Sequence, residues 1–290
     1  MSARGREREG EALASKSRIN GAIAKLEKGK PVFYTGGHGG MPLDFEAGVQ
    51  MADTWGDYIN VGMEHGPLDL AGLTQFMKGM ASVRTPTVPV LVELPFEGRS
   101  PEMVQFNAWQ VRQLLTAGVH GFLLCHAETP DAVAAVVDAM RYTFRGGTRG
   151  SGGQGTAAAI WGVSGAEYVE RADPWPLNPD GELLLGLKIE NRRALENAER
   201  TAKVPGVAFA EWGPADMSMS HGYRGEGADF ERPELRAARQ RVFDACKAAG
   251  VPFLDGCTEE NLEEKVAEGV RVIPGTPELK AFAETLKGSH

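Results

Sequence analysis

One unit recurs along the chain: a short apolar strand, a polar turn and an amphipathic helix. This alternation is typical of folds in which parallel strands are joined by helices. Eight such strands are expected, at residues 31–35, 58–62, 88–94, 121–125, 183–190, 207–212, 251–255 and 270–273. Eight units predict a (β/α)8 barrel, and a length of 290 residues is sufficient for one such domain. A doubly wound open sheet has the same local pattern and is the alternative.

The domain boundaries follow from the same pattern. Residues 1–18 are mostly charged or polar and are expected to form a flexible arm, and the barrel is expected to span residues 19–290. Helices are expected near 19–26, at 69–80 and 101–117, from Pro130, and at 277–286.

Two segments interrupt the pattern. Residues 145–180 are rich in glycine, proline and aromatic side chains, and such a long connection predicts a functional loop over the barrel mouth, with Trp161 and Trp175 lining it. The aromatic side chains between Phe96 and Trp109, including Phe106, are expected either to line the mouth or to pack between subunits.

Composition limits the partners. A net charge of −8 argues against nucleic acid or an anionic membrane surface as a partner, and no apolar run is long enough to span a bilayer. The three cysteines, Cys125, Cys246 and Cys257, are widely spaced and odd in number, which indicates free thiols in a reducing compartment. The charged N-terminus does not have the pattern of a signal peptide, so we expect a cytoplasmic protein.

Active sites of (β/α)8 barrels lie at the C-terminal ends of the strands, so polar residues directly after each strand are the first candidates. These residues are His38, Glu64, His65, Glu93, Cys125, His126, Glu128, Lys188, Glu190, Glu211, Asp216 and Asp255.

Glu190 and Asp216 follow two consecutive strands and are the expected metal ligands. Two carboxylates completed by water or substrate oxygens suit Mg²⁺ or Mn²⁺, with Co²⁺ as a further option. The alternative is structural: Glu190 would pair with Arg192 or Arg193, and Asp216 would cap its turn.

His65 is the expected acid/base residue, because it follows a buried strand and has Glu64 beside it. A histidine that is merely hydrogen-bonded within its loop is the alternative. His38, between paired glycines, is expected to contact the metal or the substrate, and the alternative is that its loop serves only as a turn.

The other histidines near the strands are weaker candidates for the active site. His126 resembles His38 in position but is the weaker candidate. His120 precedes its strand and His221 lies beyond the Asp216 turn, so both are expected to be structural.

Several motifs together resemble the HpcH/HpaI aldolase family over residues 19–275. The most specific is an Ile-Glu strand end followed by a Gly-Pro-Ala-Asp-hydrophobic-Ser turn. The matching segments are Ile189-Glu190, Gly213-Pro-Ala-Asp-Met-Ser218, Glu64-His65-Gly-Pro67, Arg141-Tyr142 to Arg149-Gly150, and Val204-Pro-Gly-Val207.

The resemblance implies a metal-dependent class II aldolase that uses a 2-oxo acid and an aldehyde. Glu190 and Asp216 would hold the cation, and His65, with Glu64 beside it, would act as acid/base. Backbone N–H groups near the turn would bind the substrate carboxylate. Contacts with the ligand are expected from Trp212, Gly213, Pro214 and Ala215. The family also tends to form hexamers built from dimers that exchange the last helix, so a homo-oligomer is expected.

The chain departs from the family pattern at three positions. Glu93 or Leu94 stands where the family usually has an arginine, Lys188 replaces a glutamine, and Gly62 replaces the aspartate that partners the histidine. Lys188 would then polarise the oxo group or pair with Glu93, and Arg99 is another possible substitute for the arginine. A Schiff base on Lys188 is less economical because both metal carboxylates are retained.

Three functions remain open from the sequence. The first is cleavage or formation of a 4-hydroxy-2-oxo acid through a pyruvate-type enolate. The second uses the same site for decarboxylation, hydration or cyclisation of a different, bulkier oxo acid. The third is a barrel that binds a ligand without catalysis.

Overall fold

The strands form a closed barrel. The computed structural model describes residues 17–224 and 229–286, and all strand pairs in its sheet are parallel. The β4–β6 pairing closes the ring, so the predicted (β/α)8 barrel is confirmed and the open sheet is wrong. The barrel strands are β1 (Val32–Gly37), β2 (Tyr58–Gly62), β3 (Val90–Glu97), β4 (Gly121–Cys125), β6 (Leu183–Lys188), β7 (Phe209–Glu211), β8 (Phe253–Leu254) and β9 (Val270–Pro274). A two-residue strand, β5 (Pro174–Trp175), pairs with the start of β6.

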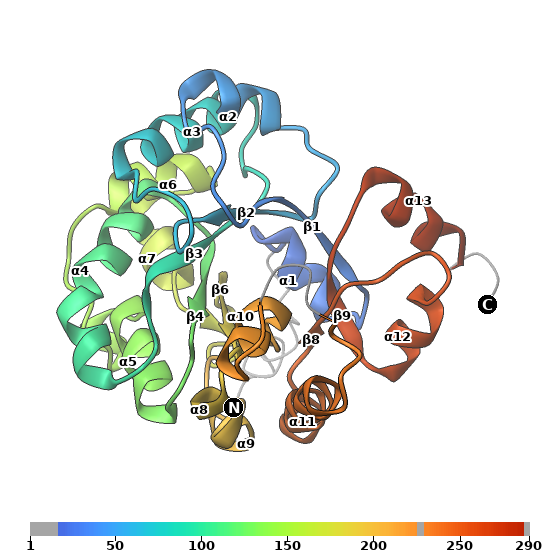
Figure 1. Ribbon diagram of the computed structural model, residues 1–290. Helices are drawn as coiled ribbons and strands as arrows, with labels where there is room; N and C mark the ends of the chain where they lie inside the picture. Colours follow the sequence, from blue (N-terminus) through green and yellow to red (C-terminus); the bar gives the residue numbers. More distant parts are fainter. Residues whose placement is uncertain (1–16, 225–228, 287–290) are drawn as a thin grey trace, which may run out of the picture.

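Helices surround this barrel (Figure 1). The predicted spans 101–117 and 277–286 agree with α4 (Pro101–Ala117) and α13 (Pro277–Leu286). Proline in the first turn and a capping hydroxyl explain why α4 begins where it does, because Ser100 accepts a hydrogen bond from the Met103 N–H. The other α-helices are α1 (Gly21–Leu26), α2 (Phe45–Met51), α3 (Leu70–Val83), α5 (Pro130–Met140), α6 (Gln154–Trp161), α7 (Gly165–Arg171), α8 (Arg192–Glu196), α9 (Ala198–Thr201), α10 (Pro214–Ser220), α11 (Pro233–Ala249) and α12 (Leu262–Glu268).

The interior of the barrel is packed rather than hollow. Apolar side chains from the strands, among them Leu91, Leu123, Leu184 and Phe209, form one buried cluster with Ile23 of α1. A larger cluster fills the space between the strands and the outer helices. The C-terminal ends of the strands, here called the mouth, therefore remain as the place for a polar site.

The segment at residues 145–180 does not cover the mouth, so this prediction was wrong. Trp161 donates from Nε1 to the carbonyl of Gly118 (2.9 Å), and its ring stacks on His120. Both contacted residues precede β4, at the opposite end of the barrel. A connection from a helix to the next strand must return to the N-terminal ends of the strands, which explains its place. Trp175, in β5, pairs with Leu184 near the start of β6 and also lies away from the mouth.

His120 is structural, as expected. It is fully buried, and burial lowers the pKa of its imidazole to about 3. Its Nδ1 accepts a hydrogen bond from the backbone N–H of Val90 (3.2 Å). The neutral ring thus ties the starts of β3 and β4 together.

The aromatic residues after β3 also lie elsewhere than the mouth. Phe96 is buried among the apolar side chains outside the strands, whereas Phe106 and Trp109 are exposed on α4. The expectation that they line the mouth was wrong, and the alternative of packing between subunits stays a prediction. All three cysteines are free thiols, as predicted.

The expected arm lies mostly outside the described residues, which begin at Ser17. Arg18 is held by Glu27 and by the buried Glu182. Among the described residues, no helix combines the length and apolar character needed to cross a membrane.

Candidate active site

A cavity of about 430 Å³ opens at the mouth. Most of the residues singled out from the sequence line it, and the exceptions are Glu64, Glu93, Arg99, Cys125, His126 and Glu128. The lining residues are Tyr34, His38, His65, Lys188, Glu190, Glu211, Trp212, Gly213, Pro214, Ala215, Asp216, Leu254, Asp255, Gly256 and Pro274. They come from six strand ends, those of β1, β2, β6, β7, β8 and β9, which agrees with the location expected for a barrel enzyme.

The turn after β7 packs closely against Glu190. Gly213 has a left-handed φ of 50°, and a Cβ there would lie 2.3 Å from the Cβ of Glu190. Only glycine allows this approach. Pro214 then starts α10 and sets Asp216 in its first turn, so both carboxylates border one cavity.

Glu190 is almost completely buried, and burial raises the pKa of its carboxyl well above the ordinary value. Its Oε1 accepts a hydrogen bond from the backbone N–H of His126 (2.8 Å). Among the described residues it pairs with neither Arg192 nor Arg193, and Arg193 lies near Glu128 instead (3.5 Å). The structural alternative for Glu190 therefore loses its support.

Lys188 lies among carboxylates. Its Nζ is 2.8 Å from Oε2 of Glu64 and 3.4 Å from Oε2 of Glu93. Burial opposes its charge, but Glu211 and its other acidic neighbours outweigh this and raise the pKa of the ammonium. The expected pairing with Glu93 is present, and an amine held in the charged form is a poor nucleophile for a Schiff base.

Glu93 and His38 form a hydrogen-bonded pair. Nδ1 of His38 lies 2.5 Å from Oε1 of Glu93, and the Asn60 amide donates to the same oxygen (2.8 Å). Burial alone would raise the pKa of Glu93, but the hydrogen bond from His38 and the charge of Lys188 outweigh it and lower that pKa. The hydrogen bond to Glu93 raises the pKa of His38.

His65 borders the cavity close to Glu64 and Asp216. Its Nε2 is 3.4 Å from Oε2 of Glu64 and 3.9 Å from Oδ2 of Asp216. The ring is half-exposed, so it is accessible from the cavity.

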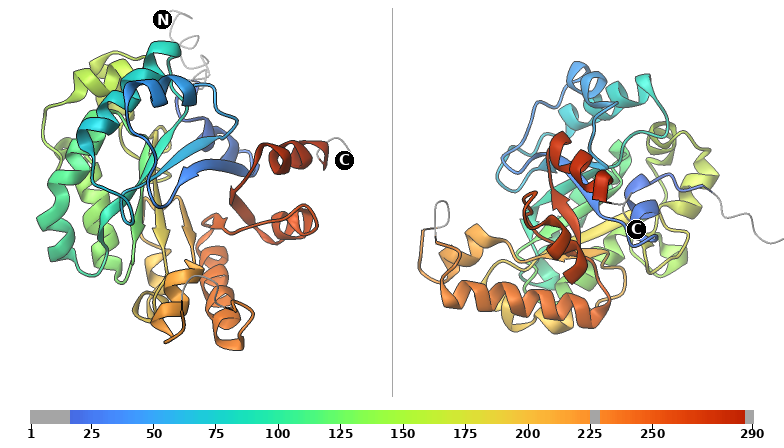
Figure 2. Two further views of the ribbon diagram at one scale, coloured as in Figure 1. Left: turned by 45° about the horizontal axis from the view of Figure 1, so that its top comes forward. Right: turned by 90° about the vertical axis from the view of Figure 1, so that its right-hand side faces the viewer.

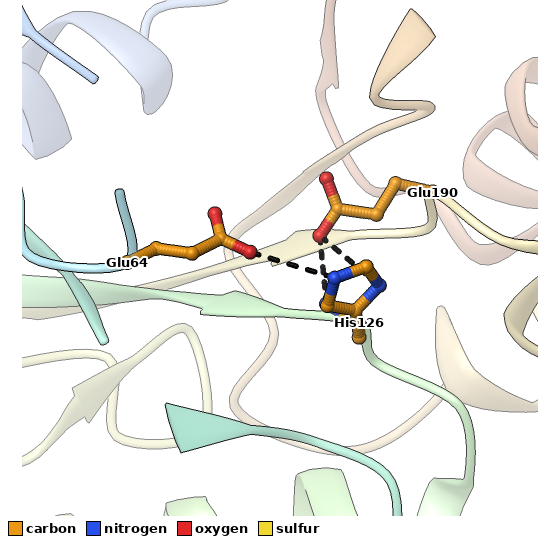
Figure 3. Close-up of side chains that lie close together, drawn as sticks. All are labelled: Glu64, His126 and Glu190. Atoms are coloured by element: carbon orange, nitrogen blue, oxygen red, sulfur yellow. Dashed lines mark hydrogen bonds and ion pairs between the residues drawn. The ribbon is translucent and has the colours of Figure 1, made fainter. Parts of the chain in front are cut away.

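His126 has a more central position than its sequence context indicated. Figure 3 shows its ring between Glu64 and Glu190, 3.6 Å from Oε1 of the first and 3.8 Å from Oε1 of the second. Its φ of 46° is the only positive value at a non-glycine residue in the described part of the chain. The sequence did contain a signal for this role, because His126 directly follows β4 just as His38 and His65 follow β1 and β2.

Glu211 is a second residue that the sequence underrated. It lines the cavity next to Lys188, its register partner on β6, and burial raises the pKa of its carboxyl to about 7.

Arg99 lies outside the cavity. It pairs with Glu97 and lines a neighbouring hollow of about 560 Å³ with His126, Glu128 and Asn191. Arg99 therefore does not line the cavity that contains Lys188, the other expected substitute for the family's arginine.

The donor set fits a hard divalent cation. Four carboxylates lie around one lysine and a fifth borders the same cavity, and Oε1 of Glu64 is buried without a hydrogen-bond partner in the described residues. Buried negative charge in this excess is compensated by protons, as the raised pKa values of Glu190 and Glu211 indicate, or by a bound cation, and carboxylate oxygens suit Mg²⁺, Mn²⁺ or Co²⁺. The carboxylates are Glu64, Glu93, Glu190, Glu211 and Asp216.

Fold and site together define a (β/α)8-barrel enzyme with an acidic, histidine-containing active site. The model of the family described as HpcH/HpaI aldolase/citrate lyase matches residues 57–283. A hydroxypyruvate/pyruvate aldolase from Agrobacterium fabrum is 30% identical over 272 residues, covering 88% of this chain and 93% of the relative. A 2-keto-3-deoxy-L-rhamnonate aldolase from Shigella dysenteriae is 30% identical over 204 residues, covering 70% and 68%.

A solved structure extends the likeness to the fold. The HpcH/HpaI aldolase/citrate lyase family protein from Burkholderia cenocepacia superposes with a TM-score of 0.69 at 25% identity, covering 93% of this chain and 97% of that one. The chain belongs to the HpcH/HpaI aldolase/citrate lyase family, whose members are lyases and generally depend on a divalent metal ion.

Proposed function

We propose that the protein is a metal-dependent aldolase that cleaves or forms a 4-hydroxy-2-oxo acid, with pyruvate or hydroxypyruvate as the oxo-acid product. The observation that carries this proposal is one cavity bordered by Glu190, Asp216 and His65 at the barrel mouth. Relatives that are named hydroxypyruvate/pyruvate aldolases support the choice of oxo acid.

Glu190 and Asp216 are proposed to hold the cation, with Mg²⁺ or Mn²⁺ preferred and Co²⁺ as a further option. When bound, the cation would act as a Lewis acid toward the oxo acid. The backbone N–H groups of the turn around Gly213, Ala215 and Asp216 would bind the substrate carboxylate. Trp212 and Pro214 would form the adjoining wall of the cavity.

His65 is proposed as the residue that moves the proton of the 4-hydroxyl group. In cleavage it accepts that proton as the bond between carbon 3 and carbon 4 breaks, and in synthesis it returns a proton to the aldehyde oxygen. Glu64 lies within 3.4 Å of its Nε2 and supports the charged ring. The positive charge of Lys188 compensates the negative charges of Glu64 and Glu93.

Assembly into a homo-oligomer through the last helix is part of the proposal. Figure 2 shows α12 and α13 standing out from the ring of helices beside β9. An apolar hollow of about 430 Å³ lies between them, lined in part by Leu262, Val266 and Leu286. Light scattering on the full chain tests this, and a monomer at working concentration would contradict it.

A coupled assay for pyruvate release from 4-hydroxy-2-oxo acids tests the function. We expect turnover that EDTA abolishes and that Mg²⁺ or Mn²⁺ restores. Activity that survives complete metal removal would rule out the metal-dependent mechanism. His65→Ala should lose turnover while still binding Mn²⁺ in calorimetry, and unchanged turnover would exclude His65 as the acid/base residue.

A further inference from the structure

A second histidine faces the same cavity and has a better-defined carboxylate partner than His65. His38 comes from the turn after β1, and its side chain is 51% exposed, whereas Glu93 behind it is fully buried. The hydrogen bond between them measures 2.5 Å, against 3.4 Å from His65 to Glu64. A buried carboxylate that orients an accessible imidazole is the arrangement of a general acid/base pair.

The tautomer of His38 follows from its two neighbours. An ionised Glu93 can only accept, so Nδ1 of His38 carries the proton that points at Oε1. The hydroxyl of Tyr34 lies 3.4 Å from Nε2, and burial raises the pKa of Tyr34, which keeps the phenol protonated. In the neutral ring Nε2 therefore presents its lone pair on the side of Tyr34, which lines the cavity, and in the charged ring Nε2 carries the second proton there.

Gly62 explains how His38 reaches this position. A Cβ at Gly62 would lie 1.8 Å from the carbonyl oxygen of His38 and 2.6 Å from that of Gly37. The turn after β1 thus occupies the space that any side chain at this position would need. Gly62 and Glu93 are register partners on β2 and β3, so the carboxyl lies directly beside the space that the turn fills.

His38 and His65 occupy different parts of the cavity. His65 lies 3.9 Å from Asp216, whereas the side-chain partners of His38 in the described residues are Glu93 and Tyr34. A cation at Glu190 and Asp216 would hold the carboxylate and oxo group of an oxo acid, so the other end of the oxo acid would point away from those two side chains. His38 is therefore placed for the reacting carbon rather than for the metal.

We propose that His38, oriented by Glu93, is a second catalytic acid/base residue, which transfers the proton at carbon 3 of the oxo acid. This inference rests on the proposed function. In cleavage, His65 takes the hydroxyl proton, the bond between carbon 3 and carbon 4 breaks, and its electron pair becomes the enolate. Nε2–H of the charged His38 then gives its proton to carbon 3, which completes the product, and solvent restores both rings. In synthesis, neutral His38 removes a proton from carbon 3, and the enolate adds to the aldehyde.

Exchange of the pyruvate methyl protons in D₂O isolates this step, because it needs no aldehyde. The protein is loaded with Mg²⁺, exchange is followed by proton NMR, and cleavage is followed by the coupled assay. We expect His38→Gln to lower the exchange rate by about 100-fold, the scale of a lost general base. The ratio of exchange to cleavage should fall in His38→Gln and rise in His65→Gln.

His221→Gln is the matched control, because this histidine lies outside the cavity and contacts the carbonyl of Met217. It should leave both rates unchanged. Exchange at the wild-type rate in His38→Gln, with cleavage measurable in the wild type, would refute the role of His38 alone. A wild type that neither cleaves the substrate nor exchanges pyruvate would instead refute the proposed function.

Glu93 is a positioning residue, and the pH profile tests it separately. The charged and titratable groups facing His38 are Glu93 of β3, Lys188 of β6, Glu211 of β7 and Tyr34 of β1. Because Glu93 raises the pKa of His38, Glu93→Gln should move the titration of the His38 Cε1–H resonance to lower pH. The rise of the exchange rate with pH should move in the same direction. An unchanged titration in a folded variant, checked by circular dichroism, would show that Glu93 does not act through His38.

Discussion

Replacing Lys188 with methionine should destabilise the protein more than any surface charge change. The side chain is 6% exposed and lies between Glu64 and Glu93, and no other cation in the described part of the chain pairs with Oε2 of Glu93. Methionine nearly preserves the volume, so the cavity cost is small. What remains is a pair of buried carboxylates that have lost their counter-charge.

Removal of one partner of a buried ion pair costs about 3–5 kcal/mol. For a domain of this size, each kcal/mol lowers the melting temperature by roughly 2–4 °C. We therefore expect Lys188→Met to melt roughly 6–20 °C below the wild type at neutral pH. Calorimetry of the metal-free proteins measures the difference.

The stability difference between Lys188→Met and the wild type should depend on pH. In the variant, loss of the positive charge of Lys188 raises the pKa of Glu93, and the penalty of the buried charge is complete where that carboxyl is ionised. Protonation removes that penalty, and the difference from the wild type should shrink as the pH falls. The pKa of Lys188 itself is raised, so its charge is lost only at strongly alkaline pH.

Lys25→Met is the matched control. Nζ of Lys25 lies 2.6 Å from Asp57, but the pair is partly exposed and Asp57 keeps Lys280 at 2.8 Å. Its loss should cost under about 1 kcal/mol. If Lys188→Met is no less stable than Lys25→Met, or if its deficit does not shrink in acid, Lys188 does not neutralise the buried carboxylates.

Three further changes have definite expected results. Gly62→Ala should displace the turn that carries His38, because its Cβ would lie 1.8 Å from the His38 carbonyl oxygen, and the His38 NMR titration should move to lower pH. Gly213→Ala should weaken Mn²⁺ binding in calorimetry by about 10–100-fold, because the new Cβ would push on Glu190. His120→Asn should flatten the acid branch of the stability curve. The pKa of His120 is lowered to about 3, so the wild type loses about 1.4 kcal/mol per pH unit as the pH falls below the ordinary value of 6.5.

Each of these changes has a check. Gly39→Ala and Gly256→Ala place a Cβ where nothing lies within 4 Å, so they should leave the His38 titration and Mn²⁺ binding unchanged. Equal effects in these controls would show that backbone stiffening, rather than the close contacts, causes the changes. An acid branch as steep in His120→Asn as in the wild type would show that other groups control acid unfolding.

The barrel was predictable because its signal is local. Strand and helix periods, proline at the starts of α4 and α5, and hydroxyl caps at Ser100 and Thr129 all act within a few residues. Closure was not visible in the same way, because the β4–β6 pairing joins segments separated by the long 145–180 connection. The misplacement of that connection had a simple cause, since composition indicates an unusual loop but not the end of the barrel on which it lies.

The site was harder to predict because its departures from the family pattern compensate one another in space. Gly62, Glu93 and His38 belong to different strand ends, and each alone is ambiguous: a missing aspartate, a reversed charge and a histidine in a glycine-rich turn. In the folded structure these three features depend on one another. The absence of a side chain at Gly62 admits the turn, and Glu93 then holds His38 at 2.5 Å. An arginine in place of Glu93 would repel a charged His38 and add to the charge of Lys188, 3.4 Å away. Restoring only the aspartate at position 62 or only the arginine at position 93 should therefore damage the site more than restoring both together, because the interactions are shared.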